Sequence, residues 1–213
     1  MESPIKIRNE KLGLTVVSAL TRRGFEACYC EKREAAVEKV MELVPKGVSV
    51  SWGGSATVQE LKLPDIFHAG DYTVLDRDRT SSPEERTAVM RKALTCDTFI
   101  TGVNAISEDG QLVSIDALGN RVAAMAFGPR SVVVVVGVNK ITKTLEDAVK
   151  RARTVAAPTN LQRFPQAGVP CLKTGACENC SSSESFCSQI LITRNCRPLG
   201  RIKVVLTGEI LGY

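Results

Sequence analysis

The chain has little histidine, few aromatic residues and no long apolar run. A single histidine, His68, stands among 213 residues, which excludes a metal centre with several histidine ligands. A Ser–His–Asp triad would depend on His68 alone, and we interpret it as a loop or partly buried histidine. Aromatic residues make up 5%, with no basic stripe interleaved among them, so the sequence predicts no nucleic-acid partner. The longest apolar run, residues 131–138, is too short to cross a bilayer, so we expect no membrane span.

The overall composition is that of an ordinary globular protein. Hydrophobic residues make up 44% and charged residues 24%, and the net charge of +5 is spread along the chain, which excludes a disordered or fibrous protein. The amino terminus lacks the apolar core of a signal peptide, so we expect a cytoplasmic protein. The length suits one α/β domain with a small appendage.

Apolar spacing alternates between helical and extended patterns. Helices are predicted at 12–20, 36–44, 57–61, 82–94, 122–127 and 144–155, and strands at 25–30, 48–52, 72–75, 98–106, 112–115 and 131–138. This alternation predicts a mainly parallel sheet with helices on both faces. The valine run at 131–138 suits a central strand, and Asp109-Gly110 predicts a hairpin turn.

A glycine-serine loop follows the strand that ends at Trp52. Gly53 and Gly54 could turn backbone N–H groups toward one point, and Ser55 and Thr57 open a short helix, an arrangement that suits a phosphate or carboxylate. The alternative is a tight turn with Ser55 as a plain helix cap.

Two further groups of polar residues interrupt or follow predicted apolar strands. Asn104, Asp116, Asn120 and Arg121 place an amide, a carboxylate and a guanidinium in one neighbourhood, although Asn120 could serve the turn and Asp116 could only pair with Arg121.

After the valine strand, Asn139 and Lys140 could meet an anion, or Lys140 could act as a base if desolvated. A solvated loop lysine is the alternative. Asn160, after a predicted break at residues 156–158, is a candidate of the same kind.

The cysteines are unevenly distributed. Cys28, Cys30 and Cys96 lie in or beside predicted elements and are interpreted as small core residues, whereas the last fifth of the chain holds the other five. Four of them are the candidate metal ligands, with Cys196 as a possible replacement: Cys171, Cys177, Cys180 and Cys187. Their spacing matches neither the ferredoxin run nor the paired zinc ribbon, so an iron–sulfur centre, a structural zinc and a set of thiols or a disulfide all stay open.

Long runs of the chain closely resemble the LUD family, the lactate-utilisation domain proteins. These runs are SWGGSATVQEL, TGVNAISEDGQLVSIDALGNRVAAMAFGPRSVVVVVGVNKIT, RARTVAAPTNLQRF and, in a cysteine-bearing branch, PCLKTGACENCSSSESFC with RIKVVLTGEILGY. The resemblance implies an α/β domain over 1–165, similar to the NagB/RpiA/CoA-transferase-like superfamily. A cysteine-rich, metal-binding-like segment over 166–197 and a strand over 198–213 that returns to the domain would follow. The polar residues shared by the family map onto Gly53, Gly54, Ser55, Thr57, Asn104, Asp116, Asn120, Arg121, Asn139, Lys140 and Asn160.

For function, the resemblance implies a role in the oxidation of L-lactate or a similar hydroxy-acid. The expected role is an accessory or electron-transfer component with a [4Fe-4S] cluster on the four cysteines, a small anionic metabolite in the pocket and iron–sulfur oxidoreductase subunits as partners. The alternative is a stand-alone enzyme or a binder of a phosphate- or CoA-bearing molecule with a structural zinc. A scaffold that works only inside a complex is the third possibility. No catalytic glutamate of the CoA-transferase kind can be placed.

Overall fold

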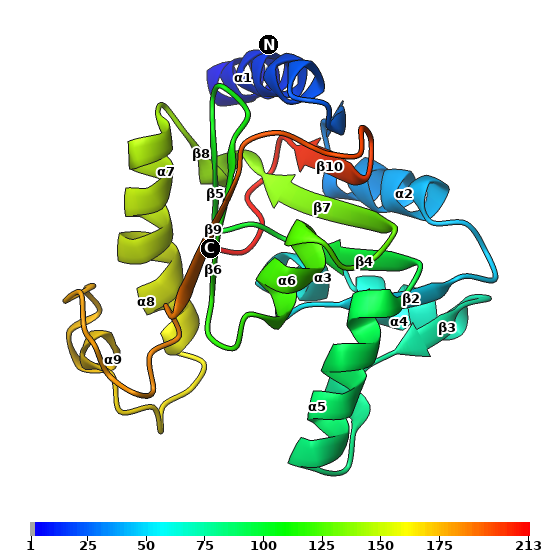
Figure 1. The fold of residues 1–213 in the computed structure, drawn as a ribbon. Helices are drawn as coiled ribbons and strands as arrows, with labels where there is room; N and C mark the ends of the chain where they lie inside the picture. The colour runs from blue at the N-terminus through cyan, green and yellow to red at the C-terminus, as the bar shows by residue number, and fades with distance from the viewer. Residues whose placement is uncertain (1–2) are drawn as a thin grey trace.

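The computed structural model describes residues 3–213 (Figure 1). The helices are α1 Pro4–Arg22, α2 Arg33–Leu43, α3 Ala56–Glu60, α4 Leu63–Ala69, α5 Pro83–Lys92, α6 Asn120–Ala126, α7 Leu145–Arg151, α8 Ala157–Leu161 and α9 Pro170–Thr174. The strands are β1 Glu26–Cys30, β2 Ser49–Trp52, β3 Thr73–Leu75, β4 Thr98–Thr101, β5 Ala105–Ser107, β6 Leu112–Asp116, β7 Ser131–Gly137, β8 Ile141–Thr142, β9 Gln189–Thr193 and β10 Ile202–Thr207.

The main sheet has six strands in the order β1-β10-β7-β4-β2-β3, and each neighbouring pair is parallel. Strand β10, near the end of the chain, lies between β1 and β7, so residues 202–207 complete the sheet that the first strand begins. Figure 1 shows β10 beside β7. The α/β class is therefore confirmed.

The valine strand β7 is buried on both faces of this sheet. Val132 and Val134 pack into the core beneath α1 and α6, whereas Val133 and Val135 pack into the core beneath α2, α3 and α4. Successive side chains of a strand point to opposite faces, so a run of one apolar residue type fits only a strand covered on both sides.

The predicted strand at 98–106 is wrong, because the chain divides there between two sheets. β4 belongs to the main sheet and β5 to a second sheet with the order β8-β5-β6-β9. The break occurs at Gly102, where an added Cβ would lie 2.8 Å from the Ser55 Oγ, and at Asn104, whose side-chain oxygen accepts from the Ile115 N–H at 2.9 Å. A tight backbone approach and a side chain that serves another strand both interrupt regular pairing.

Two local predictions are confirmed. The turn at Asp109-Gly110 joins β5 to β6 as an antiparallel pair, with Gly110 at φ +87°. The helix predicted to begin at residue 144 does so, because Thr144 caps α7 through a capping box with Asp147. The helical path does not break at residues 156–158 as predicted. Instead, the π-helical turn Ala152–Ala156 connects α7 to α8.

The second sheet and its helices form the other half of the molecule. Ala105 and Val113 of the sheet pack against Ala148 of α7 and the adjoining Ala152, and β9 joins β6 from the distant cysteine-rich part of the chain. Figure 1 shows α7 beside this sheet, with the segment around α9 beyond α8. Among residues 3–213, no helix combines the length and the apolar character that a membrane crossing requires.

Candidate anion-binding cavity

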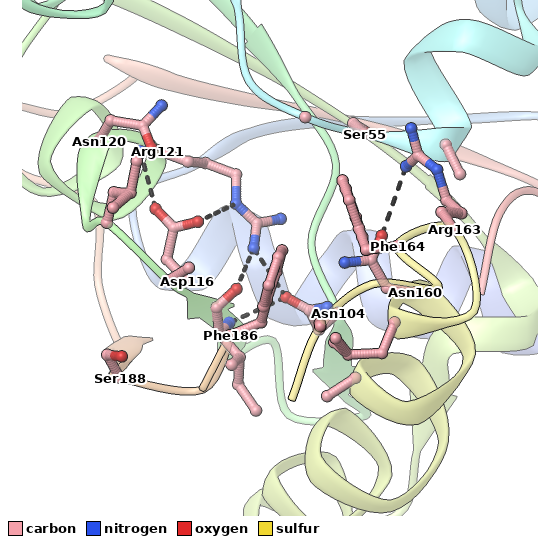
Figure 2. Close-up of a pocket in the computed structure, with 18 of the residues that line it drawn as sticks. Ser55, Asn104, Asp116, Asn120, Arg121, Asn160, Arg163, Phe164, Phe186 and Ser188 are labelled. Atoms are coloured by element: carbon pink, nitrogen blue, oxygen red, sulfur yellow. Dashed lines mark hydrogen bonds and ion pairs between the residues drawn. The ribbon is translucent and has the colours of Figure 1, made fainter. Parts of the chain in front are cut away.

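A cavity of about 750 Å³ lies where the loops after several strands meet α8 and the cysteine-rich segment. Its wall includes the loops after β2, β3, β4 and β6, as well as the residue pairs 160–161 and 163–164 and the final residue, Tyr213 (Figure 2). Parallel sheets place ligand sites beyond the carboxyl ends of their strands, and this cavity occupies that position.

Eight of the eleven predicted ligand residues line the cavity, namely Gly54, Ser55, Asn104, Asp116, Asn120, Arg121, Lys140 and Asn160. The other three, Gly53, Thr57 and Asn139, contact residues that line the cavity or the segment that closes it, as described below. The structure therefore brings the predicted residues into one region, although they come from five separate stretches of the sequence.

The glycine-serine loop has part of its polar capacity already in use. The Gly53 N–H donates to the Ile100 carbonyl at 3.3 Å, and the Ser55 Oγ accepts from the Val58 N–H at 3.3 Å as the cap of α3. An added Cβ on Gly53 would lie 3.2 Å from the Arg121 side chain, so this glycine gives room to the arginine. These are the contacts expected of a turn and helix cap, and Gly54 and Ser55 remain at the cavity wall.

Arg121 is a buried cation that holds the cavity wall together. Its guanidinium donates to the Gly102 carbonyl at 3.3 Å, to the Asn104 side-chain oxygen at 3.1 Å and to the Ile115 carbonyl. Burial lowers the pKa of Arg121, and the neighbouring Asp116 opposes that shift. Asp116 in turn accepts from the Arg121 backbone N–H at 2.9 Å. Figure 2 shows this guanidinium between Asp116 and Asn104, with interactions to both.

Lys140 is buried, which rules out the solvated loop lysine. Its side chain donates to the Thr57 Oγ1 at 3.0 Å and to the Val103 carbonyl at 3.2 Å, and the residue is only 4% exposed. Burial lowers its pKa to about 7, and the nearby charges of Arg151 and Arg121 add to the shift. Lys140 is therefore an amine that loses its proton near neutral pH.

Asn139 and Asn160 contact the carboxyl-terminal segment of the chain in different ways. Asn139 binds the carboxyl-terminal segment, since its side-chain oxygen accepts from the Leu211 N–H at 3.2 Å and its amide donates to the Gly212 carbonyl at 3.3 Å. Asn160 faces the cavity from α8, and its oxygen accepts from the Tyr213 hydroxyl at 3.3 Å. Together they hold the end of the chain against the site.

Arg77 is a cavity residue that the motif analysis missed. It follows β3 in the short 3₁₀ helix Arg77–Arg79, and its guanidinium lies over the glycine-serine loop, where an added Cβ on Gly54 would be 2.7 Å from Nη2. Its Nε is buried and has no hydrogen-bond partner among the described residues. The nearest carboxylate oxygen, on Asp78, is 3.8 Å away. Burial lowers the pKa of Arg77. The signal that could have found it was its place after a strand, the rule applied to the other loops.

An aromatic and cationic wall was also missed. Phe164 and Phe186 pack with ring centroids 4.9 Å apart, and the Arg163 guanidinium lies 5.7 Å from the centre of the Phe164 ring. Arg163 also donates to the Tyr213 hydroxyl at 3.3 Å. Figure 2 shows Phe164 and Phe186 on opposite segments that meet at the cavity. No local motif marks these residues, because their contact depends on how the cysteine-rich segment folds back.

The cysteine-rich segment itself forms part of the cavity wall. Residues 183–186 and Ser188, between or beside two of the predicted metal ligands, line the cavity. The segment is anchored by Glu184, which accepts from the Gly168 N–H at 2.7 Å, and by Ser182, whose hydroxyl donates to the Gly168 carbonyl at 3.1 Å. The pocket residues and the cysteine-rich segment, which were predicted as separate features, are thus adjacent in the structure.

The four predicted metal ligands share one electrostatic neighbourhood. Burial is the main cause that raises the pKa of the Cys171 and Cys187 thiols, and both are raised further by Cys177 and Cys180. Thiolate is the donor that zinc and iron–sulfur clusters take, so the donor chemistry fits either centre. However, no three His, Cys, Asp or Glu side chains among residues 3–213 are arranged to hold one ion. The donor set fits a metal, and the side-chain arrangement is not that of a closed site.

The remaining cysteines lie in or against the apolar cores. Cys196 is 1% exposed, donates to the Pro198 carbonyl at 3.1 Å and accepts from the Ile202 N–H at 3.2 Å, so it packs in the core beside β10. Cys96 is also buried, while Cys28 and Cys30 are half-buried against the core under α2.

His68 lies on helix α4 rather than in a loop and is partly buried. Its Nε2 is 2.9 Å from Asp76 Oδ2, and its ring packs edge-on against Trp52. It does not line the cavity.

Fold and site together define an α/β protein with a cationic cavity at the carboxyl edge of a parallel sheet. The chain belongs to the LUD domain family, whose match covers residues 15–207 and which is associated with lactate utilisation. The structure is similar to a DUF162 family protein from Deinococcus radiodurans, with a TM-score of 0.55, 11% identity and coverage of 94% of this chain and 98% of that one. Partial matches include eIF2B beta from Chaetomium thermophilum, with a TM-score of 0.38, 16% identity and coverage of 54% and 44% of the two chains. No match was found among curated proteins.

Proposed function

We propose that this is a cytosolic accessory or electron-transfer component in the oxidation of L-lactate or a similar small hydroxy-acid. In this proposal, the cavity binds the carboxylate of the acid or of its 2-oxo product, and the four cysteines hold a redox-active [4Fe-4S] centre beside it. Zinc is the alternative occupant.

The observation that carries the proposal is the excess of basic over acidic side chains in the cavity wall, five against three. Arg163 has no ion-pair partner within 4.0 Å in the part of the chain that the structure describes, and the only carboxylate within that distance of Arg77 is Asp78, at 3.8 Å. The Arg77 guanidinium lies beside Gly54 at the cavity wall, where its terminal N–H groups would donate to an anionic ligand. Arg86, by contrast, is paired with Asp78 at 2.9 Å.

The place of the cysteine segment supports the second part of the proposal. Residues 183–186 line the cavity and lie directly between Cys180 and Cys187, so a centre held by these thiols would lie close to a bound acid. A bound cluster would supply one-electron redox chemistry. The protein's own contribution would be to bind and orient the acid through Arg77 and the polar wall and to restrict water.

The experiment measures iron, zinc and acid-labile sulfide in protein purified without oxygen, together with the melting temperature in L-lactate and in pyruvate. The proposal expects iron with matching sulfide and a rise in melting temperature with at least one acid. Protein without iron or sulfide would contradict the cluster, and no shift with either acid would contradict the binding of these ligands.

A second candidate is favoured by the size of the cavity. About 750 Å³ is in the range of pockets for ligands far larger than a three-carbon acid. The cavity also has an aromatic wall, so a phosphate- or CoA-bearing molecule is the alternative ligand, with zinc as a structural centre. A larger melting-temperature shift with coenzyme A than with lactate or pyruvate, in a protein that contains zinc, would favour it.

A further inference from the structure

We propose that the Nζ of Lys140 is a nucleophile that forms an imine with a 2-oxo acid held in the cavity. This deepens the proposed function and rests on it, since the oxidation of a 2-hydroxy acid produces a ketone next to the carboxylate. The assignment gives the buried lysine a chemical role that anion binding alone does not require.

The hydrogen bonds of Lys140 are compatible with a neutral amine. Two acceptors face the Nζ, the Thr57 Oγ1 at 3.0 Å and the Val103 carbonyl at 3.2 Å. A neutral amine has two hydrogens, so these acceptors use both of them and leave the lone pair available. A salt-bridged ammonium would face a carboxylate within 4.0 Å, and no such ion pair exists for Lys140 among the described residues.

The charges around Lys140 favour the same form. Arg121 and Arg151 both act against its protonation, and Glu60 acts in the opposite direction with a smaller effect. The guanidinium of Arg151 is fixed nearby by the Asn104 carbonyl at 2.6 Å and the Asn139 carbonyl at 3.2 Å. Desolvation next to fixed cations is how proteins activate a lysine for attack on carbonyl groups.

The cavity supplies what the reaction partner needs. Lys140 and Arg77 line the same cavity, so the proposal places the carboxylate of the ligand near the arginine and its ketone near the lysine. In the proposed step, the amine lone pair forms a C–N bond to the ketone carbon. The ketone oxygen leaves as water, and its two protons come from the amine nitrogen, which gives the neutral imine. No electron is transferred, so the step needs no oxidant or reductant.

The imine is tested by trapping it with cyanoborohydride. Wild-type protein is incubated at pH 7 with pyruvate and the reductant, digested with trypsin and mapped by mass spectrometry. Reduction leaves a carboxyethyl group on the modified lysine, which blocks cleavage there. The peptide 131–140 is then replaced by the modified peptide 131–143.

The chain offers a matched control in Lys143, whose side chain is 76% exposed and paired with Glu108. We expect Lys140 to be modified at least ~10-fold faster than Lys143, because an exposed lysine is almost wholly protonated at pH 7. L-lactate, which has no ketone, must give no adduct. The variant Lys140→Arg keeps hydrogen-bond donors at this position but has no amine that can form an imine, so it must lose the fast modification.

Calorimetric titration of the wild type with pyruvate separates the two proposals. If pyruvate binds and Lys140 is modified no faster than Lys143, the imine is refuted and the proposed binding stands. If pyruvate does not bind and no selective adduct forms, both proposals fail. Fast, saturable modification of Lys140 supports both.

Discussion

The buried amine of Lys140 makes a prediction about stability as well as chemistry. Replacement of Lys140 with Met removes a group whose pKa is about 7 in the folded protein and 10.5 as the ordinary value. Between about pH 7 and pH 10.5, the unfolded state therefore binds more protons than the folded state. The wild-type free energy of unfolding should rise with pH through this window, and the contribution of Lys140 to that rise should be absent from Lys140→Met.

The magnitude follows from the size of the shift. The full difference from 10.5 to about 7 corresponds to about 5 kcal/mol as an upper value. Between pH 7 and pH 9 the wild type should gain about 2 kcal/mol relative to Lys140→Met. The variant also leaves the Val103 carbonyl and the Thr57 hydroxyl without a donor, but that cost is independent of pH and cancels in the comparison.

The assay is urea denaturation of both proteins at pH 7 and pH 9. A gain of about 2 kcal/mol shifts the wild-type midpoint by about 1 M relative to the variant. Lys143→Met, which removes an exposed lysine, should behave like the wild type. Parallel pH dependence in wild type and Lys140→Met would refute the burial and depressed pKa of Lys140.

Three further predictions concern the wall of the cavity. Arg121→Met should lower the free energy of unfolding by about 3–5 kcal/mol, because it leaves Asp116 and buried carbonyl groups without their cation. In urea denaturation, a loss below about 1 kcal/mol would contradict this role of Arg121. Cys180→Ser should lose bound metal while its circular dichroism spectrum stays that of the folded domain. Cys196→Ser should keep the metal. Equal metal content in both variants and the wild type would contradict the assignment of Cys180 as a ligand. Phe186→Ala should weaken ligand binding in calorimetric titration with little change in melting temperature, because it removes the contact with Phe164 at the cavity wall; unchanged affinity would contradict a closing role for this ring.

The sheet could be predicted because its patterns are local. The valine run of β7 permits only a strand buried on both faces, and the caps at Ser82 and Thr144 fix the starts of their helices. The division of residues 98–106 between two sheets could not be predicted, because it depends on the contact of Gly102 with the distant Ser55 and on the partners of Asn104.

The site was predicted where residues follow a strand and belong to a recognisable run. Asp116 and Lys140 met both conditions and line the cavity. Arg77 met only the first and was missed, and Phe186 met neither, since its position depends on the fold of the cysteine-rich segment.

The most direct test of the central claim is calorimetric titration of wild type, Arg77→Gln and Arg79→Gln with L-lactate and pyruvate. Arg77 lies over the glycine-serine loop with an N–H that has no acceptor within residues 3–213, whereas Arg79 is a neighbouring arginine with a side chain that is 61% exposed. The account predicts that affinity falls about 10- to 100-fold in Arg77→Gln, the effect of one lost charge-assisted hydrogen bond, and stays unchanged in Arg79→Gln. Equal affinity of all three proteins, or no binding of either acid, would contradict it.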